Sequence, residues 1–332
     1  MNCCTSYYDR KRKNRLDGKT VAITGATDGI GLATALECAH RGAHLILLSR
    51  NQEKMERAKK MIEQEVNDSE IDLVKLDLSD VDSVKNAAKN LIKGGFRINI
   101  LVLNAGLAHY KPELLYGINS GSDLKIQFSS LILSKIFKVI NHFSHFLLLH
   151  LLLDHLVGSE SEPARVVALS SEAHTLANGS GKFWQKYASE EIATKELGTG
   201  SDISGAYAES KLANILHMKS MAEHHPHINF VSVHPGVVNT SFADKWKSGI
   251  ENKCYLCFVR TLSFSWKPCI KTPYQGCQTS IYCICSKDIV QGQYYSDNKP
   301  KRIRIRGSKD LNLIKNQLYE LSMDFVQSCM NK

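Results

Sequence analysis

The feature that most constrains the fold is an alternation of short, apolar, β-branched runs with amphipathic segments from Gly18 onward. Such runs, flanked by turn residues, are typical of parallel strands that helices cover on both faces. The pattern therefore predicts one α/β domain with a Rossmann-type, doubly wound parallel sheet of about seven strands. The expected strands are Thr20–Thr24, His44–Leu48, Ile71–Lys75, Ile100–Leu103, Arg165–Leu169, Asn229–His234 and Gln293–Tyr295, and helices are expected at Gly29–Arg41, Gln52–Asn67, Ser79–Lys93 and Ala206–Ala222.

A glycine-rich turn lies between the first expected strand and the first helix and reads TGATDGIG at residues 24–31. Gly25 permits a tight turn, Gly29 allows a phosphate to approach the backbone, and Gly31 allows helix and strand to pack closely. A turn that only needs small residues is the alternative. The turn predicts a pyrophosphate site, with contacts from Gly25, Thr27, Asp28, Gly29, Ile30 and Gly31.

Three residues form a second candidate site. Tyr207 and Lys211 are four residues apart and fall on one face of the expected helix. An ammonium beside a phenol favours the phenolate, so we expect Lys211 to lower the pKa of Tyr207 and to suit it to proton transfer. Ser171 follows the fifth strand, at the sheet edge where open α/β sheets bind ligands.

Together with Asp77-Leu78, Asn104-Ala105-Gly106 and PGVVNT at 235–240, these motifs resemble the short-chain dehydrogenase/reductase family over nearly all of residues 18–297. RVVALSSEAH at 165–174 and AYAESKLANIL at 206–216 resemble its retinol-dehydrogenase-like branch. The interval of 36 residues from Ser171 to Tyr207 is similar to the oxidoreductase domain of the WW-domain-containing oxidoreductase, here without WW domains.

The resemblance implies a role for each matching residue. Tyr207 would be the acid/base, Lys211 its ribose-binding partner, Ser171 the residue that orients the carbonyl, and Asn141 the holder of a proton-relay water. The implied reaction is hydride transfer between a nicotinamide cofactor and a lipophilic alcohol or carbonyl, such as a retinoid, a steroid or a fatty aldehyde. Further implied cofactor contacts are Arg50, Asp77, Leu78, Asn104, Ala105, Gly106, Tyr207, Lys211, Pro235, Gly236, Val238 and Thr240.

The end of the second strand bears on the choice of cofactor. Ser49-Arg50 supplies a cation suited to the 2′-phosphate of NADP, where an acidic residue would favour the 2′-hydroxyl of NAD. Asp28 argues for NAD, so NAD stays open as the alternative. We expect NADP.

One segment departs from the family pattern. Ser129–Lys138 separates two stretches, 122–128 and 139–146, that are nearly adjacent in the family. Ten residues of helix advance about 15 Å and leave the flanking segments roughly 80° out of phase. We interpret residues 129–138 as an insertion beside Asn141. The alternative function is therefore a catalytically weakened, cofactor-binding scaffold or regulatory protein of the same fold.

The formal charge of +9 is concentrated near the two ends, because residues 1–19 and 297–310 each hold six bases and two acids. A basic face for nucleic acid would be spread over the folded body, so no nucleic-acid partner is expected. Residues 1–17 are expected to be a basic tail, 18–298 the enzyme domain, and 299–332 a basic segment followed by a helix. Cys3 and Cys4 beside the tail suggest peripheral membrane association, with an unstructured tail as the alternative.

The expected location is cytoplasmic, with membrane association open, and the chain is not expected to be secreted, because residues 1–17 hold no apolar signal segment. Homo-oligomers are expected only by family analogy. No metal site is expected, since the histidines between His142 and His155 fall on a helix and the cysteines lack ligand spacing. The segment Cys254–Cys285 is expected to cover a lipophilic substrate.

Overall fold

A computed structural model of the chain describes residues 15–107, 139–177, 203–239, 270–305 and 310–331. These residues build one sheet of eight strands in the order β3-β2-β1-β4-β5-β6-β7-β8. The first seven pair in parallel, and β8 is antiparallel to β7. The strands are β1 (Thr20–Thr24), β2 (His44–Ser49), β3 (Ile71–Lys75), β4 (Ile98–Leu103), β5 (Arg165–Leu169), β6 (Asn229–His234), β7 (Tyr294–Ser296) and β8 (Lys299–Pro300).

The expected Rossmann-type fold is confirmed, with one strand more than the seven expected. The additional strand forms a hairpin whose two turn residues, Asp297 and Asn298, have φ of 52° and 61°. Positive φ at both turn positions matches the right-handed twist of the strands, and Asp and Asn tolerate it better than most residues. A strand of two residues has no apolar periodicity, which is why the sequence pattern did not reveal it.

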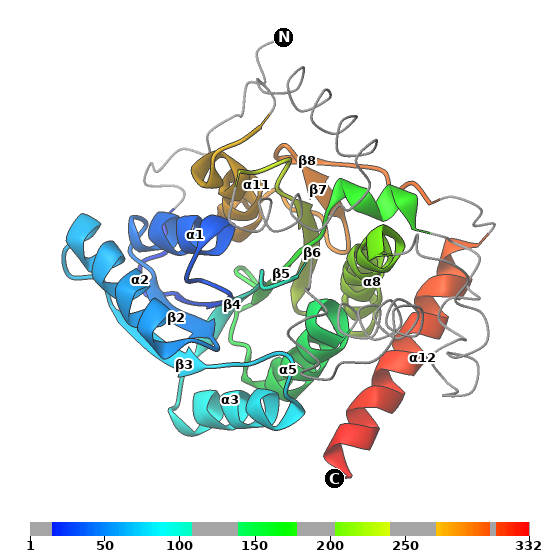
Figure 1. The fold of residues 1–332 in the computed structure, drawn as a ribbon, viewed down its shortest axis with the longest axis horizontal. Helices are drawn as coiled ribbons and strands as arrows, with labels where there is room; N and C mark the ends of the chain where they lie inside the picture. Colours follow the sequence, from blue (N-terminus) through cyan, green and yellow to red (C-terminus); the bar gives the residue numbers. More distant parts are fainter. Residues whose placement is uncertain (1–14, 108–138, 178–202, 240–269, 306–309, 332) are drawn as a thin grey trace, which may run out of the picture.

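Helices cover both faces of the sheet (Figure 1). One layer holds α1 (Gly29–Ala39), α2 (Gln52–Glu65) and α11 (Pro273–Cys285), and the other holds α3 (Val81–Lys93), α5 (Ser144–Leu152) and α8 (Ile203–His224). A last helix, α12 (Leu311–Met330), packs across α8 and α5 on the outside of the second layer (Figure 1).

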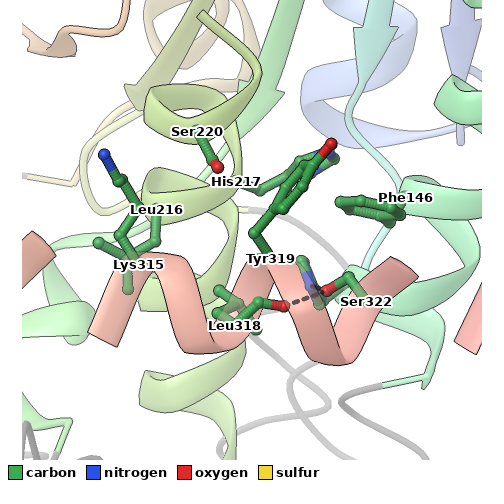
Figure 2. Close-up of a pocket in the computed structure, with 9 residues that line it drawn as sticks. Phe146, Leu216, His217, Ser220, Lys315, Leu318, Tyr319 and Ser322 are labelled. Carbon is green, nitrogen blue, oxygen red and sulfur yellow. Dashed lines mark hydrogen bonds between the residues drawn. The ribbon is translucent and has the colours of Figure 1, made fainter. Parts of the chain in front are cut away.

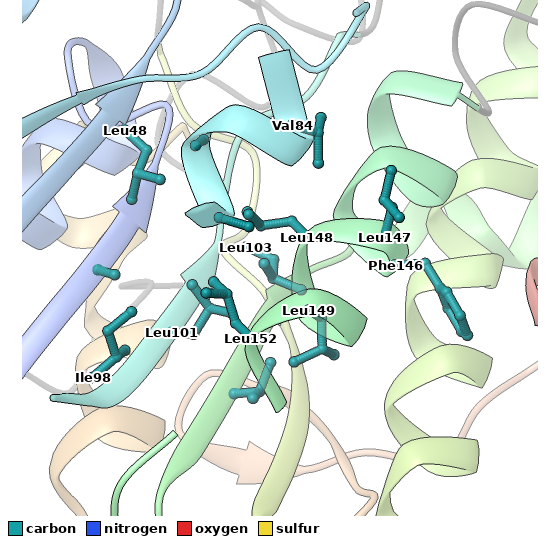
Figure 3. Close-up of a cluster of buried hydrophobic side chains, with 14 of the residues drawn as sticks. Leu48, Val84, Ile98, Leu101, Leu103, Phe146, Leu147, Leu148, Leu149 and Leu152 are labelled. Carbon is teal, nitrogen blue, oxygen red and sulfur yellow. The ribbon is translucent and has the colours of Figure 1, made fainter. Parts of the chain in front are cut away.

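The strand residues alternate between two separate cores. Val21 and Ile23 of β1 join the core beneath α1 and α11, whereas Ala22 joins the core beneath α3, α5 and α8. In the second core, leucines of α5 pack towards Leu101 and Leu103 of β4 (Figure 3). Burial of each leucine side chain contributes about 1.5–3 kcal/mol, so this interface holds α5 firmly against the sheet.

Helix α11 corrects part of one expectation. Residues 254–269 of the expected substrate cover lie outside the described residues, but Pro273–Cys285 is a core helix packed on α1. Cys277, Ile281 and Ile284 recur at helical spacing and are at most 1% exposed. The helix starts with a capping box between Thr272 and Gln275. Its apolar face therefore packs inside the protein and does not cover a substrate.

The segment after the expected insertion begins with a π-helical turn, η3 (Val139–Phe143), which runs directly into α5. Residues 129–138 themselves lie outside the described residues. A π-helical turn widens the helix locally and is frequent at functional sites. It places Asn141 in the second helical layer, beside the ends of the central strands.

Candidate active site

The glycine turn lies at the carboxyl end of β1, next to β4, where the order of strands in the sheet reverses. Open α/β sheets bind ligands at this switch point. Gly25 has a φ of +67° and donates its N–H to the carbonyl of Leu48 on β2 at 2.8 Å. Asp28 caps α1, and its side chain accepts the N–H of Gly29 at 2.7 Å.

The turn is closely packed at Gly31, where no side chain fits. A Cβ on Gly31 would lie 2.2 Å from the carbonyl oxygen of Gly25 and 2.5 Å from Nδ2 of Asn104. That nitrogen braces the turn from the side, because it donates to the carbonyl of Thr24 at 2.8 Å and of Gly25 at 3.2 Å. These features fit a dinucleotide pyrophosphate at the N-terminus of α1.

Replacing Gly31 with Ala should lower the affinity for NADPH at least about tenfold and destabilise the fold by about 1–3 kcal/mol. The new methyl group meets backbone, so the turn must move. NADPH fluorescence titration and urea unfolding measure the two effects.

Gly95→Ala is the matched control, because a Cβ there meets nothing within 4 Å, although its φ of +69° adds some strain. Gly31→Ala protein that binds NADPH as tightly as the wild type would show that the close approach does not matter.

The other expected cofactor residues gather at the same edge of the sheet. Arg50 lies exposed after β2, Asp77 and Leu78 follow β3, and Asn104 to Gly106 follow β4. After β6 come Pro235, Gly236 and Val238, and Gly236 has a φ of +89°. Thr240 lies outside the described residues.

The remaining candidates come from β5, α8 and η3. Ser171 follows β5 and caps the short 3-10 helix η5 (Glu172–Leu176). Tyr207 interacts with the Ser171 side chain, and Nζ of Lys211 lies 5.7 Å from the centre of the Tyr207 ring. Lys211 donates to the carbonyl of Leu169 at 3.1 Å. The three side chains predicted from sequence are therefore neighbours.

The charges in this site differ from the expectation. Burial raises the pKa of Tyr207 to about 12, and its hydrogen bond with Ser171 offsets only part of that rise. Burial also lowers the pKa of Lys211 to about 8. The expected lowering of the Tyr207 pKa by Lys211 is therefore not found in the protein without cofactor, because burial sets the direction of the shift.

Three hydrogen bonds hold the side chain of Asn141. Its Oδ1 accepts the N–H of Leu107 at 2.7 Å, while its Nδ2 donates to the Leu107 carbonyl at 2.9 Å and to Oγ of Ser210 at 3.0 Å. Gly106 leaves room between Asn141 and Lys211, since a Cβ there would lie 3.3 Å from Oδ1 and 3.3 Å from Nζ. Asn141 therefore lies next to Lys211, despite the departure from the family pattern before it.

Several residues support these candidates, although no role was predicted for them from the sequence. Oγ of Ser170 donates to the Lys211 carbonyl at 2.7 Å, and Nδ1 of His174 lies 2.7 Å from the Ser171 carbonyl. Ser210 links Asn141 to the Tyr207 carbonyl, to which it donates at 2.8 Å. Ser170, His174 and Ser210 lie within the motifs quoted above, so their proximity in sequence was the available signal.

The structure also contains a small pocket that is separate from the candidate active site. It lies between α5, α8 and α12, is lined by His217, Ser220, Tyr319 and Ser322 among others, and has no room for a water molecule (Figure 2). None of the catalytic candidates lines it. Across the described ranges, no three potential ligands cluster as a metal site, and no helix is long and apolar enough to cross a membrane.

Known proteins resemble this chain over most of its length. The short chain dehydrogenase family profile matches residues 19–197. Retinol dehydrogenase 12 of Bos taurus is 33% identical over 315 residues, covering 92% of this chain and 87% of that protein. Retinol dehydrogenase 11 of Homo sapiens is 31% identical over 318 residues, covering 94% and 87%.

A solved short chain dehydrogenase from Burkholderia cenocepacia, in complex with NADP, has the same fold with a TM-score of 0.57. It is 19% identical and covers 85% of this chain and 97% of its own. Family profile, relatives and fold agree, so the chain belongs to the short-chain dehydrogenase family of oxidoreductases, which act on CH–OH and C=O groups.

Proposed function

We propose that this protein is an NADP-dependent oxidoreductase that interconverts a lipophilic alcohol and its carbonyl compound. The observation that carries the proposal is that four side chains lie together beside the glycine turn: Ser171, Tyr207, Lys211 and Asn141. When bound, the nicotinamide cofactor supplies or accepts the hydride. The chain supplies orientation and proton transfer.

The roles follow from chemistry and position. The Tyr207 hydroxyl is protonated at neutral pH, since its pKa is about 12, and it donates a proton to the oxygen of a carbonyl substrate. Ser171 donates a second hydrogen bond that orients the same oxygen. Lys211 stabilises the resulting phenolate and holds the ribose of the cofactor. Asn141 holds a water that returns a proton to this pair.

An apolar substrate is supported by two exposed apolar side chains and by the relatives. Leu176 in η5 and Val237 after β6 are each 54% exposed, close in sequence to Ser171 and to the proposed cofactor residues. The similar proteins named above are retinol dehydrogenases. We therefore propose a retinoid, a steroid or a fatty aldehyde as substrate.

The test is NADPH oxidation with retinal, steroid ketones and medium-chain aldehydes, on protein first shown to bind NADPH. Turnover with at least one of these supports the enzyme. Tight NADPH binding with no turnover on any of them supports the alternative, a cofactor-binding scaffold. The departure at residues 129–138 favours that alternative, whereas the hydrogen bonds that hold Asn141 favour the enzyme.

Replacing Arg50 with Gln should lower NADPH affinity about ten- to a hundredfold and leave NADH affinity unchanged, because the guanidinium at the end of β2 meets the 2′-phosphate only in NADPH. Fluorescence titration with both cofactors gives the ratio. Arg57→Gln, an exposed arginine further along α2, is the matched control. Equal or tighter binding of NADH by the wild type would remove the NADP assignment.

A further inference from the structure

A chain of hydrogen bonds connects the start of the glycine turn with Asn141. It begins at Thr24, the last residue of β1, whose side chain is fully buried. Oγ1 of Thr24 accepts two backbone N–H groups, from Asn104 and from Ala105, both at 3.0 Å. A hydroxyl oxygen has two acceptor positions, so both are taken, and Thr24 has only its proton left to give.

Because Thr24 must donate this proton, the tautomer of His145 can be assigned. Nε2 of His145 lies 3.0 Å from Oγ1 of Thr24, closer than the alternative acceptor, the carbonyl of Val102, at 3.4 Å. Since Thr24 must donate, Nε2 accepts and carries no proton. Burial lowers the pKa of His145 to about 4, which keeps the ring neutral at pH 7. The single ring proton is therefore on Nδ1.

Nδ1 faces Asn141, at the other end of this row of hydrogen bonds. It lies 3.3 Å from the main-chain carbonyl of Asn141, which can only accept. Both side-chain protons of Asn141 are already donated, to Leu107 and Ser210. The main-chain carbonyl is thus the part of Asn141 that a neighbour of the active site can still orient, and His145 contacts it.

We propose that His145 is a positioning residue, which ties the end of β1 to the carbonyl of Asn141 and so holds the proton-relay position relative to the cofactor turn. The inference rests on the proposed function and deepens it. A side chain that only filled this space would be apolar, as Phe146 and Leu147 are beside it. Instead both ring nitrogens of a 2% exposed histidine meet groups of the two functional segments.

The charged and titratable groups around His145 are few in the described part of the chain. Lys211 and His217 face it from α8, and His142 faces it from η3. Its contact on β1 is the neutral hydroxyl of Thr24, which in turn accepts the backbone N–H groups of Asn104 and Ala105 after β4. Of these groups, Lys211 is the one that belongs to the candidate active site.

Two-bond ¹H–¹⁵N correlation spectra of protein labelled with ¹⁵N-histidine test the arrangement without any turnover. The expected His145 signal, assigned by its loss in His145→Asn, is a neutral Nδ1–H tautomer at pH 7. It should persist in Thr24→Ser, lose its hydrogen-bonded Nε2 shift in Thr24→Val, and move when NADP⁺ is added. An Nε2–H tautomer or a charged ring at pH 7 overturns the proposal.

Kinetics of three variants test its consequence. The amide of Asn reaches the place of Nδ1, whereas that of Gln reaches the place of Nε2, so His145→Asn keeps the contact with Asn141 and His145→Gln keeps the contact with Thr24. We expect His145→Asn to retain kcat within about threefold. His145→Gln and His145→Phe should lower kcat about tenfold, with KM little changed and a larger solvent deuterium isotope effect.

A merely structural histidine predicts a different result. All three variants would then lose thermal stability and kcat together, with the isotope effect and the pH profile unchanged, and the proposal would be wrong. Should His145→Phe not fold, the Asn and Gln pair still decides. A wild type that turns over none of the carbonyl compounds refutes the proposed function, while the tautomer and its response to NADP⁺ still decide the role of His145.

Discussion

Tyr207→Phe protein should reduce a carbonyl substrate with kcat/KM lowered about 10³-fold, while its affinity for NADPH stays within about threefold of the wild type. Phe keeps the ring beside Lys211 and removes only the hydroxyl that interacts with Ser171. Because the hydroxyl is the proton donor, its loss leaves hydride transfer without a partner for the developing alkoxide. Steady-state kinetics and NADPH titration on the same preparation separate these two effects.

The matched control is Tyr319→Phe on α12, which removes a hydroxyl from a ring that stacks on His224 at 4.2 Å, outside the site. We expect that variant to retain kcat/KM. If Tyr207→Phe and Tyr319→Phe lost activity equally, the loss would reflect general damage to the second helical layer. If neither lost activity, Tyr207 would not be the acid.

The strands were largely predictable, because burial on both faces leaves a plain mark in the sequence. The bounds of β1, β3, β5 and β6 match the apolar runs residue for residue. Helix α11 was missed because its cysteines, serine and glutamine do not read as an apolar face, although Cys277, Ser280 and Gln278 are at most 1% exposed. Small polar residues pack inside when helices approach closely.

Contacts between site residues were predictable where both residues lie in one motif. They were not predictable where the two residues are far apart in the sequence. Tyr207 and Lys211 share a helix, so their neighbourhood follows from spacing alone. Thr24 and His145 are 121 residues apart, and only the packing of α5 on the sheet brings them together. The pKa of Tyr207 depends on burial by the whole fold. No local pattern carries that information.

The protein should lose stability steeply between pH 6.5 and pH 5, because of three buried histidines that form a neutral cluster. Burial lowers the pKa of His142 to about 3, of His145 to about 4 and of His217 well below its usual value. The ring of His217 lies 5.4 Å from that of His142 and 4.6 Å from that of Phe146. His142, His217 and Phe146 line the space between α5, α8 and α12, where Figure 2 labels His217 and Phe146.

The sign follows from proton binding. Well above pH 6.5 the three rings are neutral in both states, so the full stability is present. As the pH falls, the unfolded chain binds protons first, because its histidines keep a pKa of about 6.5. Each histidine then costs about 2 kcal/mol by pH 5, and three cost about 6 kcal/mol, against a typical total of 5–15 kcal/mol. Urea unfolding at a series of pH values measures this loss.

His217→Phe isolates the contribution of one ring, since Nε2 of His217 has no hydrogen-bond partner among the described residues. The variant should resemble the wild type at pH 7 and be about 2 kcal/mol more stable at pH 5, so the two stability curves cross. His155→Gln, which removes an exposed ring, is the control. Parallel curves for His217→Phe and the wild type would show that the cluster is not what acid disrupts. A crossing would show that acid first destabilises the region where α12 covers the helices that carry Asn141, Tyr207 and Lys211. Activity should then fall together with stability as the pH is lowered.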